Sequence, residues 1–309
     1  MNDVMNRITK KLLNMVSDIE EDFKGAYNIR QDGECVARKT SENINIVSKD
    51  NNSGIEVYVK DNTKDEIVYI PACVTKGGVD DLVYNDIHIG ENCDVKIVSG
   101  CGVSTDNEKE AKHSGAHRFF IGKSSSVRYE EKHVGIGNGD GYRTINPITE
   151  ASLDEDAYLE MDTSQISGVS IAKRKTEVSL AKGAKLVVRE RLFTEGNQEV
   201  ETIFNVSLDG EDASADIVSR SVARDKSYQA FESTIIGHAK CYGHSECDSI
   251  IDDDAIVDST PRLIARNKEA SLIHEAAIGK IAGEQILKLK TLGLSDEEAE
   301  SIIINGFLE

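Results

Sequence analysis

The segment Ile89–Val95, IGENCDV, contains a pattern that recurs along the chain. An apolar residue is followed by three turn-forming residues, a small residue, one spacer and a second apolar residue. The same order occurs in IGKSSSV (Ile121–Val127), LDEDAYL (Leu153–Leu159) and LAKGAKL (Leu180–Leu186), and looser versions begin at Leu208, Ile236 and Ile264. Successive starts are 27 to 32 residues apart. A period this regular predicts stacked structural repeats.

The composition of residues 42–276 indicates which kind of repeat this is. Short β-branched runs alternate there with Gly, Asn, Asp and Ser, and no repeat has a strong helical period. A small residue at a fixed place in each turn suits closely stacked rungs, so we predict a mainly β chain with a β-helix, or β-solenoid, core over residues 42–276. A propeller fits less well, since its blades need about 40 residues or more. An accidental period in a turn-rich β protein is the remaining alternative.

The two ends of the chain differ from this core. Residues 1–41 are expected to form a helical cap and linker, because an apolar stripe before Gly25 has helical spacing: Val4, Ile8, Leu12, Met15, Val16 and Ile19. A solenoid has open ends that need covering, and a terminal helix can provide such a cap.

Residues 277–309 are predicted to form a second helical segment. One apolar stripe comprises Ile278, Ile281, Ala282, Ile286 and Leu289, and Gly293 then interrupts the chain. Ser295 with Glu298 predicts a capping box at the start of a last helix. We expect that helix to bury Ala299, Ile302 and Ile303 and to end at Asn305-Gly306.

Bulk composition narrows the function classes. The chain has 309 residues, is 39% hydrophobic, lacks Trp and has only 5% aromatic residues, so an aliphatic core is expected. Its formal charge of -19 makes nucleic acid an improbable partner on electrostatic grounds. It contains no apolar run long enough to span a bilayer and no signal-peptide pattern at its start, so we expect a cytoplasmic protein. A reducing cytosol disfavours structural disulfides in a chain of this size. None of the six cysteines forms a C-x-x-C pair, which disfavours a closed cysteine-rich zinc site.

Cys247 is the first candidate for chemistry. It lies in the sequence GHSECDS near the end of the repeats, between Glu246 and Asp248. Neighbouring carboxylates raise a thiol pKa, so this cysteine is not an activated nucleophile. A thiolate near carboxylates is better suited to hold iron or zinc. The simpler interpretation is that Cys247 is a small core residue.

His274 and Glu275 follow one repeat later. The interval from Cys247 to His274 is 27 residues, so we expect the two residues to lie on neighbouring rungs. Adjacent residues of a strand point to opposite faces, so either His274 or Glu275 can face Cys247, and both can do so only if the strand ends there. A hydrogen-bonded structural histidine is the alternative for His274.

Other residues are weaker candidates. Cys241 and His244 flank the turn before Cys247, and Cys101 is expected in a turn, SGCG. A dispersed group comprises His113, His117 and His133, where Ser114-Gly115 argues against a helical His-x3-His site. The run GIGNGDG (Gly135–Gly141) lacks the ending of a phosphate loop and is interpreted as a turn. Asp252–Asp254 is interpreted as a solvated turn.

Several segments resemble the SufB/SufD family of iron-sulfur cluster assembly proteins. The resemblance extends over roughly residues 87–309, and the last two of its segments are specific: SRSVARDKSYQAF (Ser219–Phe231), ECDSII (Glu246–Ile251), IHEAAIGKIAGEQI (Ile273–Ile286) and GLSDEEAESIIINGFL (Gly293–Leu308). It implies a right-handed parallel β-helix flanked by helices, a homodimer or heterodimer, and a SufC-like ABC ATPase bound at the C-terminal helices. It further implies that Cys247, His274 and Glu275 take part in forming a nascent iron-sulfur cluster at the dimer interface.

The chain departs from the family pattern in length. It lacks most of the N-terminal extension of SufB and ends directly after Gly306-Phe307-Leu308, so we expect a compact, SufB-like homodimer. The predicted function is therefore a scaffold and not an enzyme, with a transient cluster and with recipient apo-proteins as further partners. Two alternatives remain: a β-helix metalloenzyme with a mononuclear zinc or iron site at Cys247 and His274, or a structural subunit that stabilises a cluster-bearing partner.

Overall fold

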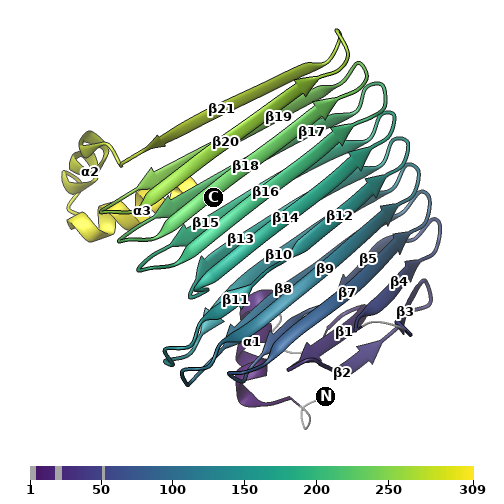
Figure 1. The fold of residues 1–309 in the computed structure, drawn as a ribbon, viewed down its shortest axis with the longest axis horizontal. Helices are drawn as coiled ribbons and strands as arrows, with labels where there is room; N and C mark the ends of the chain where they lie inside the picture. The colour runs from purple at the N-terminus through teal and green to yellow at the C-terminus, as the bar shows by residue number, and fades with distance from the viewer. Residues whose placement is uncertain (1–4, 18–22, 51–52) are drawn as a thin grey trace.

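The computed structural model describes residues 5–17, 23–50 and 53–309. Within these residues it is mainly β, forming a solenoid of about eight turns with helices toward both ends of the chain (Figure 1). The predicted fold class is confirmed. No helix among the described residues is long and apolar enough to cross a membrane. Val4 and Ile19 of the predicted N-terminal stripe lie outside the described residues.

Two sheets make up the solenoid. The eleven-stranded sheet contains β1 (Ala26–Gln31), β2 (Glu34–Lys39), β5 (Lys64–Tyr69), β6 (Ala72–Val74), β8 (Asp94–Ser104), β10 (Ser126–Ile136), β13 (Tyr158–Ser167), β15 (Lys185–Thr194), β17 (Ser214–Ala223), β19 (Tyr242–Ile251) and β21 (Ser271–Gly279). The ten-stranded sheet contains β3 (Ile44–Ser48), β4 (Ile55–Val59), β7 (Asp80–Ile89), β9 (Ala111–Ile121), β11 (Arg143–Ile145), β12 (Ile148–Leu153), β14 (Ile171–Leu180), β16 (Glu199–Leu208), β18 (Tyr228–Gly237) and β20 (Ile256–Ala265).

From β7 onward the chain alternates between the two sheets, with β11 and β12 as two consecutive pieces in the ten-stranded sheet, so that each rung contributes to both sheets. All strand pairs are parallel except β1 with β2 and β3 with β4, near the N-terminus. Every second residue of a strand faces the space between the two sheets. These residues form a buried core that is mostly aliphatic, as the composition predicts.

The repeated sequence pattern corresponds to the turn between the two strands of a rung. Its first apolar residues stack on one another in register, Ile89 on Ile121 and Ile121 on Leu153. The residue before the small one has a left-handed backbone, with φ between 53° and 67° at Asn92, Ser124, Asp156 and Gly183. Asn, Asp and Gly tolerate that conformation, and the small residue that follows is fully buried, which explains the order of residue types.

The looser repeats contain one register difference. Leu208 stacks on Gly237, whereas Ile236 pairs with Ser207 and, on the next rung, with Ile264. The predicted repeat start at Ile236 is therefore displaced by one residue. The turn after Leu208 accounts for part of the irregularity, because its left-handed residue is Asp212, one position later than in the regular turns.

Strands begin before the predicted core boundary, since β1 and β2 already occupy part of residues 1–41. The helix α1 (Arg7–Ser17) packs on β8 and β10 and buries Leu12, Leu13 and Val16. Figure 1 shows it lying against the N-terminal third of the solenoid. Met15, which the predicted stripe includes, is 37% exposed.

The contact between α1 and β8 explains the glycines of the SGCG sequence. A Cβ at Gly100 would lie 2.4 Å from the Cβ of Val16, and one at Gly102 would lie 2.8 Å from a methyl carbon of Leu12. Cys101, between them, points the other way, into the solenoid interior. The prediction that Cys101 lies in a turn is wrong, because the whole SGCG sequence is within β8.

Replacing Gly100 with alanine is expected to destabilise the protein by about 1–3 kcal/mol, because the added methyl group overpacks the α1–β8 contact. Denaturant unfolding of the variant measures this loss. Gly279→Ala is the matched control, since a Cβ there meets no atom within 4 Å. Equal stability of the two variants would contradict the assigned packing of α1.

The C-terminal segment differs in part from its prediction. The strand β21 continues to Gly279, so Ile278 belongs to the sheet and α2 (Gly283–Lys290) begins after Ala282. The capping box of Ser295 and Glu298 at α3 (Asp296–Leu308) is confirmed. The predicted C-cap at Asn305-Gly306 is wrong, because the helix continues to Leu308.

The helix α3 docks on β17 through a face that matches the predicted one only in part. Ala299 is buried as predicted, together with Ile304 and Leu308, whereas Ile302 is 50% exposed and Ile303 is only partly buried. Ile304 and Leu308 pack on Val222 of β17. This docking leaves apolar residues of both C-terminal helices uncovered.

Candidate functional site

Cys247 and His274 face the solenoid interior from neighbouring strands. Cys247 lies on β19 and pairs in register with Ala276 of β21, while His274 pairs with Ser245 of β19. Because Ser245 and Cys247 have the same parity along β19, Cys247 and His274 project from the same face of the sheet and are diagonal neighbours. The sequence left open whether His274 or Glu275 faces inward with Cys247, and the register selects His274.

The two inner residues differ in accessibility. Cys247 is 2% exposed, and burial raises the pKa of its thiol, an effect that the charges of Glu190 and Asp248 reinforce. His274 is partly buried, and its Nδ1 has no hydrogen-bond partner among the described residues. Burial also lowers the pKa of His274, so its imidazole is neutral at neutral pH, the form that binds a metal.

Glu275 lies on the opposite, outer face of the same sheet. It pairs in register with Glu246, and its Oε2 is 3.7 Å from Nε2 of His244. One ligand atom from each of His244, Glu246 and Glu275 lies within 4.8 Å of the other two. The structure therefore does not bring Cys247, His274 and Glu275 to one place, and it forms a second three-residue group on the outside.

The outer group has the features of a hard-ligand metal site. Nδ1 of His244 is 2.8 Å from Oδ1 of Asp216, an arrangement that orients the ring and leaves Nε2 facing the carboxylates. An open groove of about 590 Å³ adjoins it, lined in part by His244, Glu246, Arg220 and Leu308 at the end of α3. Burial, followed by the charge of Asp248, raises the pKa of Glu246.

A row of buried polar residues occupies the interior before Cys247. Arg174 on β14 forms an ion pair with Glu131 on β10 and lies 3.5 Å from Oε1 of Glu190 on β15. The other oxygen of Glu190 accepts a hydrogen bond of 2.7 Å from Ser219, which pairs in register with Cys247. Polar groups thus extend through the core toward the C-terminal site.

Opposing forces set the ionisation of this row. Burial favours a protonated Glu131, but the charges of Arg174 and His133 prevail and hold the pKa of Glu131 well below its usual range. Burial dominates at Glu190 and raises its pKa. Burial lowers the pKa of Arg174, but the charges of Glu131 and Glu190 raise it by more. Arg174 therefore remains the cation between the two carboxylates.

The residues of this row were not singled out from the sequence. The sequence nevertheless contains a signal for them. Every second residue of a strand faces inward, and Glu131 holds such a position in the series Val127, Tyr129, Glu131, His133. Glu190 holds the same kind of position in the series Leu186, Val188, Glu190, Leu192. A charged residue within an otherwise apolar inward series indicates a buried, paired charge.

The remaining histidine candidates lie in strands. His113 and His117 are both on β9, so the prediction that this pair is not helical is confirmed. His113 has its Nδ1 3.1 Å from Oδ2 of Asp81, which also pairs with Arg30. His117 is fully buried, and burial lowers its pKa to about 4, so it is neutral at neutral pH.

The other candidates have structural roles. Cys241 is buried in the main core next to the start of β19. The glycines of Gly135–Gly141 abut neighbouring backbone; a Cβ at Gly137, for example, would lie 2.2 Å from the carbonyl oxygen of Thr105. Gly135 and Ile136 are the last residues of β10, and the predicted turn corresponds only to the irregular connection from Gly137 to Gly141, where backbones approach closely. Asp252–Asp254 forms an exposed turn, as predicted.

Comparisons with known proteins place this geometry in context. The family model described as "SUF system FeS cluster assembly, SufBD core domain" matches residues 78–307. An iron-sulfur cluster assembly SufBD family protein of Methanothermobacter thermautotrophicus is 29% identical over 248 residues, covering 79% of this chain and 59% of the relative. A SufBD family protein of Methanocaldococcus jannaschii is 27% identical over 237 residues, covering 76% and 74%.

A third relative, a SufBD family protein of Pyrococcus horikoshii, is 28% identical over 246 residues, covering 75% of this chain and 69% of the relative. The chain spans about three fifths of the length of the Methanothermobacter relative. The family match includes β19, β21 and both C-terminal helices, and therefore the whole neighbourhood of Cys247 and His274.

Proposed function

The chain belongs to the SufBD family of iron-sulfur cluster assembly proteins, and from that premise we propose that it is the scaffold on which a nascent cluster forms. Cys247 and His274 hold the cluster at the interface between two copies of the chain. The iron-sulfur cluster is cargo, assembled and then released to recipient apo-proteins in the cytoplasm. The chain itself is a scaffold and not an enzyme, and a SufC-like ABC ATPase supplies the energy.

One observation carries this proposal: His274 faces inward on the edge strand β21, beside the buried Cys247 of β19, at an end of the solenoid that no further strand covers among the described residues. The strands β20 and β21 are last in their sheets, so each has an edge without a strand partner among the described residues. Inward-facing residues of β21 are only partly covered, and Ile278 is 42% exposed. A free strand edge beside exposed apolar residues is a template for association, and a second copy would enclose both pairs of ligands.

The ligand types suit temporary binding. Thiolate and imidazole both bind iron, and few protein ligands per chain favour a cluster that can leave. Glu275, on the outer face, acts with His244 and Glu246, whose carboxylates and imidazole suit Fe2+ before it enters the cluster. This assigns the inner and outer groups to different steps of one process.

Anaerobic reconstitution with iron and sulfide tests the scaffold assignment. Cys247→Ala is expected to abolish the bound cluster, measured as iron and sulfide per chain and by visible absorption. Cys241→Ala is the matched control, because Cys241 is a second buried cysteine near the same strand and is expected to leave the cluster intact. Normal cluster content in Cys247→Ala would show that this chain is not the scaffold, or that its site lies elsewhere.

The C-terminal helices provide a surface for the ATPase partner. Leu287 of α2, Leu292 between the helices and Ile302 of α3 are 62%, 79% and 50% exposed. Uncovered apolar residues grouped on one segment are typical of a protein-binding surface. ATP-driven movement of a partner bound there would act on α3, which is docked on β17, and so on the end of the solenoid.

Leu292→Asp is expected to weaken binding of the SufC-like ATPase by about tenfold or more, since it places a charge in an apolar contact. Titration calorimetry with the purified partner measures the change. Leu82→Asp, at another exposed leucine on β7, is the control and should bind normally. Equal affinity of both variants and the wild type would place the ATPase contact elsewhere.

A further inference from the structure

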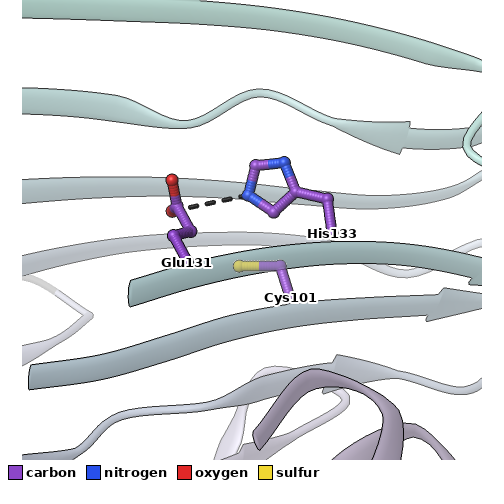
Figure 2. A group of neighbouring side chains, drawn as sticks. All are labelled: Cys101, Glu131 and His133. Atoms are coloured by element: carbon purple, nitrogen blue, oxygen red, sulfur yellow. Dashed lines mark ion pairs between the residues drawn. The ribbon is translucent and has the colours of Figure 1, made fainter. Parts of the chain in front are cut away.

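A third group of ligand-type side chains lies deep inside the solenoid, far along the chain from Cys247. Figure 2 shows Cys101 of β8 beside Glu131 and His133 of β10, with their reactive atoms turned toward one another. One ligand atom from each lies within 4.8 Å of the other two. The three residues are 2%, 0% and 1% exposed, so water does not reach them freely.

The register of the two strands creates this group. Cys101 and His133 are paired directly across β8 and β10, and Glu131 lies two positions earlier on the same inward face. The glycines on either side of Cys101 let α1 approach the outer side of β8 closely. The group is therefore held by adjacent strands within a closed core, and not by mobile loops.

Two buried atoms of the group meet only in a long ion-pair contact. Oε1 of Glu131 and Nε2 of His133 lie 3.4 Å apart (Figure 2), and neither makes a hydrogen bond within the described part of the chain. A buried polar atom without a hydrogen bond costs about 1–3 kcal/mol. A bound ion between the two atoms would satisfy both of them.

We infer that Cys101, Glu131 and His133 form a buried binding site for a single divalent transition-metal ion, Zn2+ or Fe2+, separate from the cluster site. A thiolate, an imidazole nitrogen and a carboxylate oxygen are ligands that these ions share. Three protein ligands leave a fourth, open position on a tetrahedral ion. This inference does not depend on the proposed function of Cys247.

Binding of the metal ion changes the protonation of Cys101 and the position of the ring proton of His133. The Cys101 thiol loses one proton to solvent as the thiolate binds the ion. His133 binds through Nε2, so its single ring proton must be on Nδ1, which lies 3.3 Å from Nη2 of Arg174. Arg174 therefore gives up that contact and keeps its ion pairs with Glu131 and Glu190.

The nearby guanidinium opposes a cation and makes the site weaker than a closed cysteine-rich zinc site. Burial nevertheless slows dissociation of the ion, because an ion enclosed by the two sheets cannot leave without local opening. The ion is best acquired while the solenoid folds, when the ligands are still accessible.

Cobalt substitution tests the site. The full chain carrying Cys247→Ala is produced in defined medium with Co2+ and without added zinc, so that the cluster-site thiol cannot contribute. We expect a near-ultraviolet thiolate-to-cobalt charge-transfer band with the intensity of about one thiolate-bound Co2+ per chain; the outer group of His244, Glu246 and Glu275 contains no thiolate and cannot give this band. In this background Cys101→Ser is expected to remove the band, and Glu131→Gln to reduce its intensity by about tenfold or more.

Cys73→Ser is the matched control for the cobalt experiment. Cys73 is a buried thiol on the neighbouring strand β6, but it packs in the cluster under α1, on the other side of the sheet. That variant should keep the band, and circular dichroism establishes that every variant is folded. Absence of the band from the Cys247→Ala protein, or an unchanged band in Cys101→Ser, would overturn the inference. An unchanged band in Glu131→Gln would do the same if Cys101→Ser does not fold.

Discussion

Arg174→Met is expected to destabilise the protein by roughly 3–5 kcal/mol, the usual cost of removing one partner from a buried ion pair. Arg174 is the cation that Glu131 and Glu190 share in the core, and its side chain is 4% exposed. Methionine fills a similar volume but leaves Glu190 without its arginine partner and Glu131 with His133 alone. Denaturant unfolding gives the free energy directly.

The pH dependence of the same variant gives a second test. In the wild type, the pKa of Glu131 is lower in the folded than in the unfolded state. Its contribution to stability is thus complete above the unfolded pKa and is lost as the pH falls through the folded pKa. Without Arg174, burial raises the folded pKa, so protonation relieves the buried charge. The stability difference between Arg174→Met and wild type should therefore be smaller at about pH 5 than at about pH 7.

Arg191→Met is the control for this experiment. Arg191 forms an ion pair with Asp162 on the outer surface, where both side chains are about a third exposed. Pairs of this kind contribute about 0–1 kcal/mol. If Arg174→Met lost no more stability than Arg191→Met, the buried polar row would not be the charge-paired network that the structure shows.

Ile278→Asp is expected to abolish both dimer formation and cluster assembly. The substitution places a carboxylate on the last inward-facing rung, at a position 42% exposed in the single chain, so the monomer tolerates it. In the proposed dimer the same side chain would be enclosed, and an unpaired buried charge costs several kcal/mol. Light scattering measures the mass in solution, and iron per chain after anaerobic reconstitution measures the cluster.

Ile148→Asp is the matched control for Ile278→Asp. Ile148 is 40% exposed, but it lies on β12 in the middle of the solenoid, away from both ends. It should dimerise and assemble a cluster normally. A dimeric Ile278→Asp protein with full cluster content would contradict the proposed interface, while loss of the dimer with retention of the cluster would place assembly within one chain.

The sequence predicted the solenoid because its turns are under strict local control. A left-handed residue such as Asp156 must be followed by a small buried one such as Ala157, and this requirement repeats on every regular rung. The register at Gly237 was missed, because a turn that is one residue longer shifts the stacking without disturbing the local pattern.

The site was predicted less completely for a related reason. A spacing of one repeat was enough to place Cys247 and His274 on neighbouring strands, but not to determine which face each occupies. Glu275 is adjacent to His274 in sequence and is separated from it by the thickness of the sheet. The residues that join Glu275 on the outer face, His244 and Glu246, depend on the strand register, which the sequence alone does not provide.

An iron-edge anomalous difference map of crystals of the anaerobically reconstituted protein tests the central claim most directly. The account predicts iron peaks bonded to Sγ of Cys247 and next to His274, at the junction of two copies of the chain. Iron found only at His244, Glu246 and Glu275, or absent from the end of the solenoid, would contradict it.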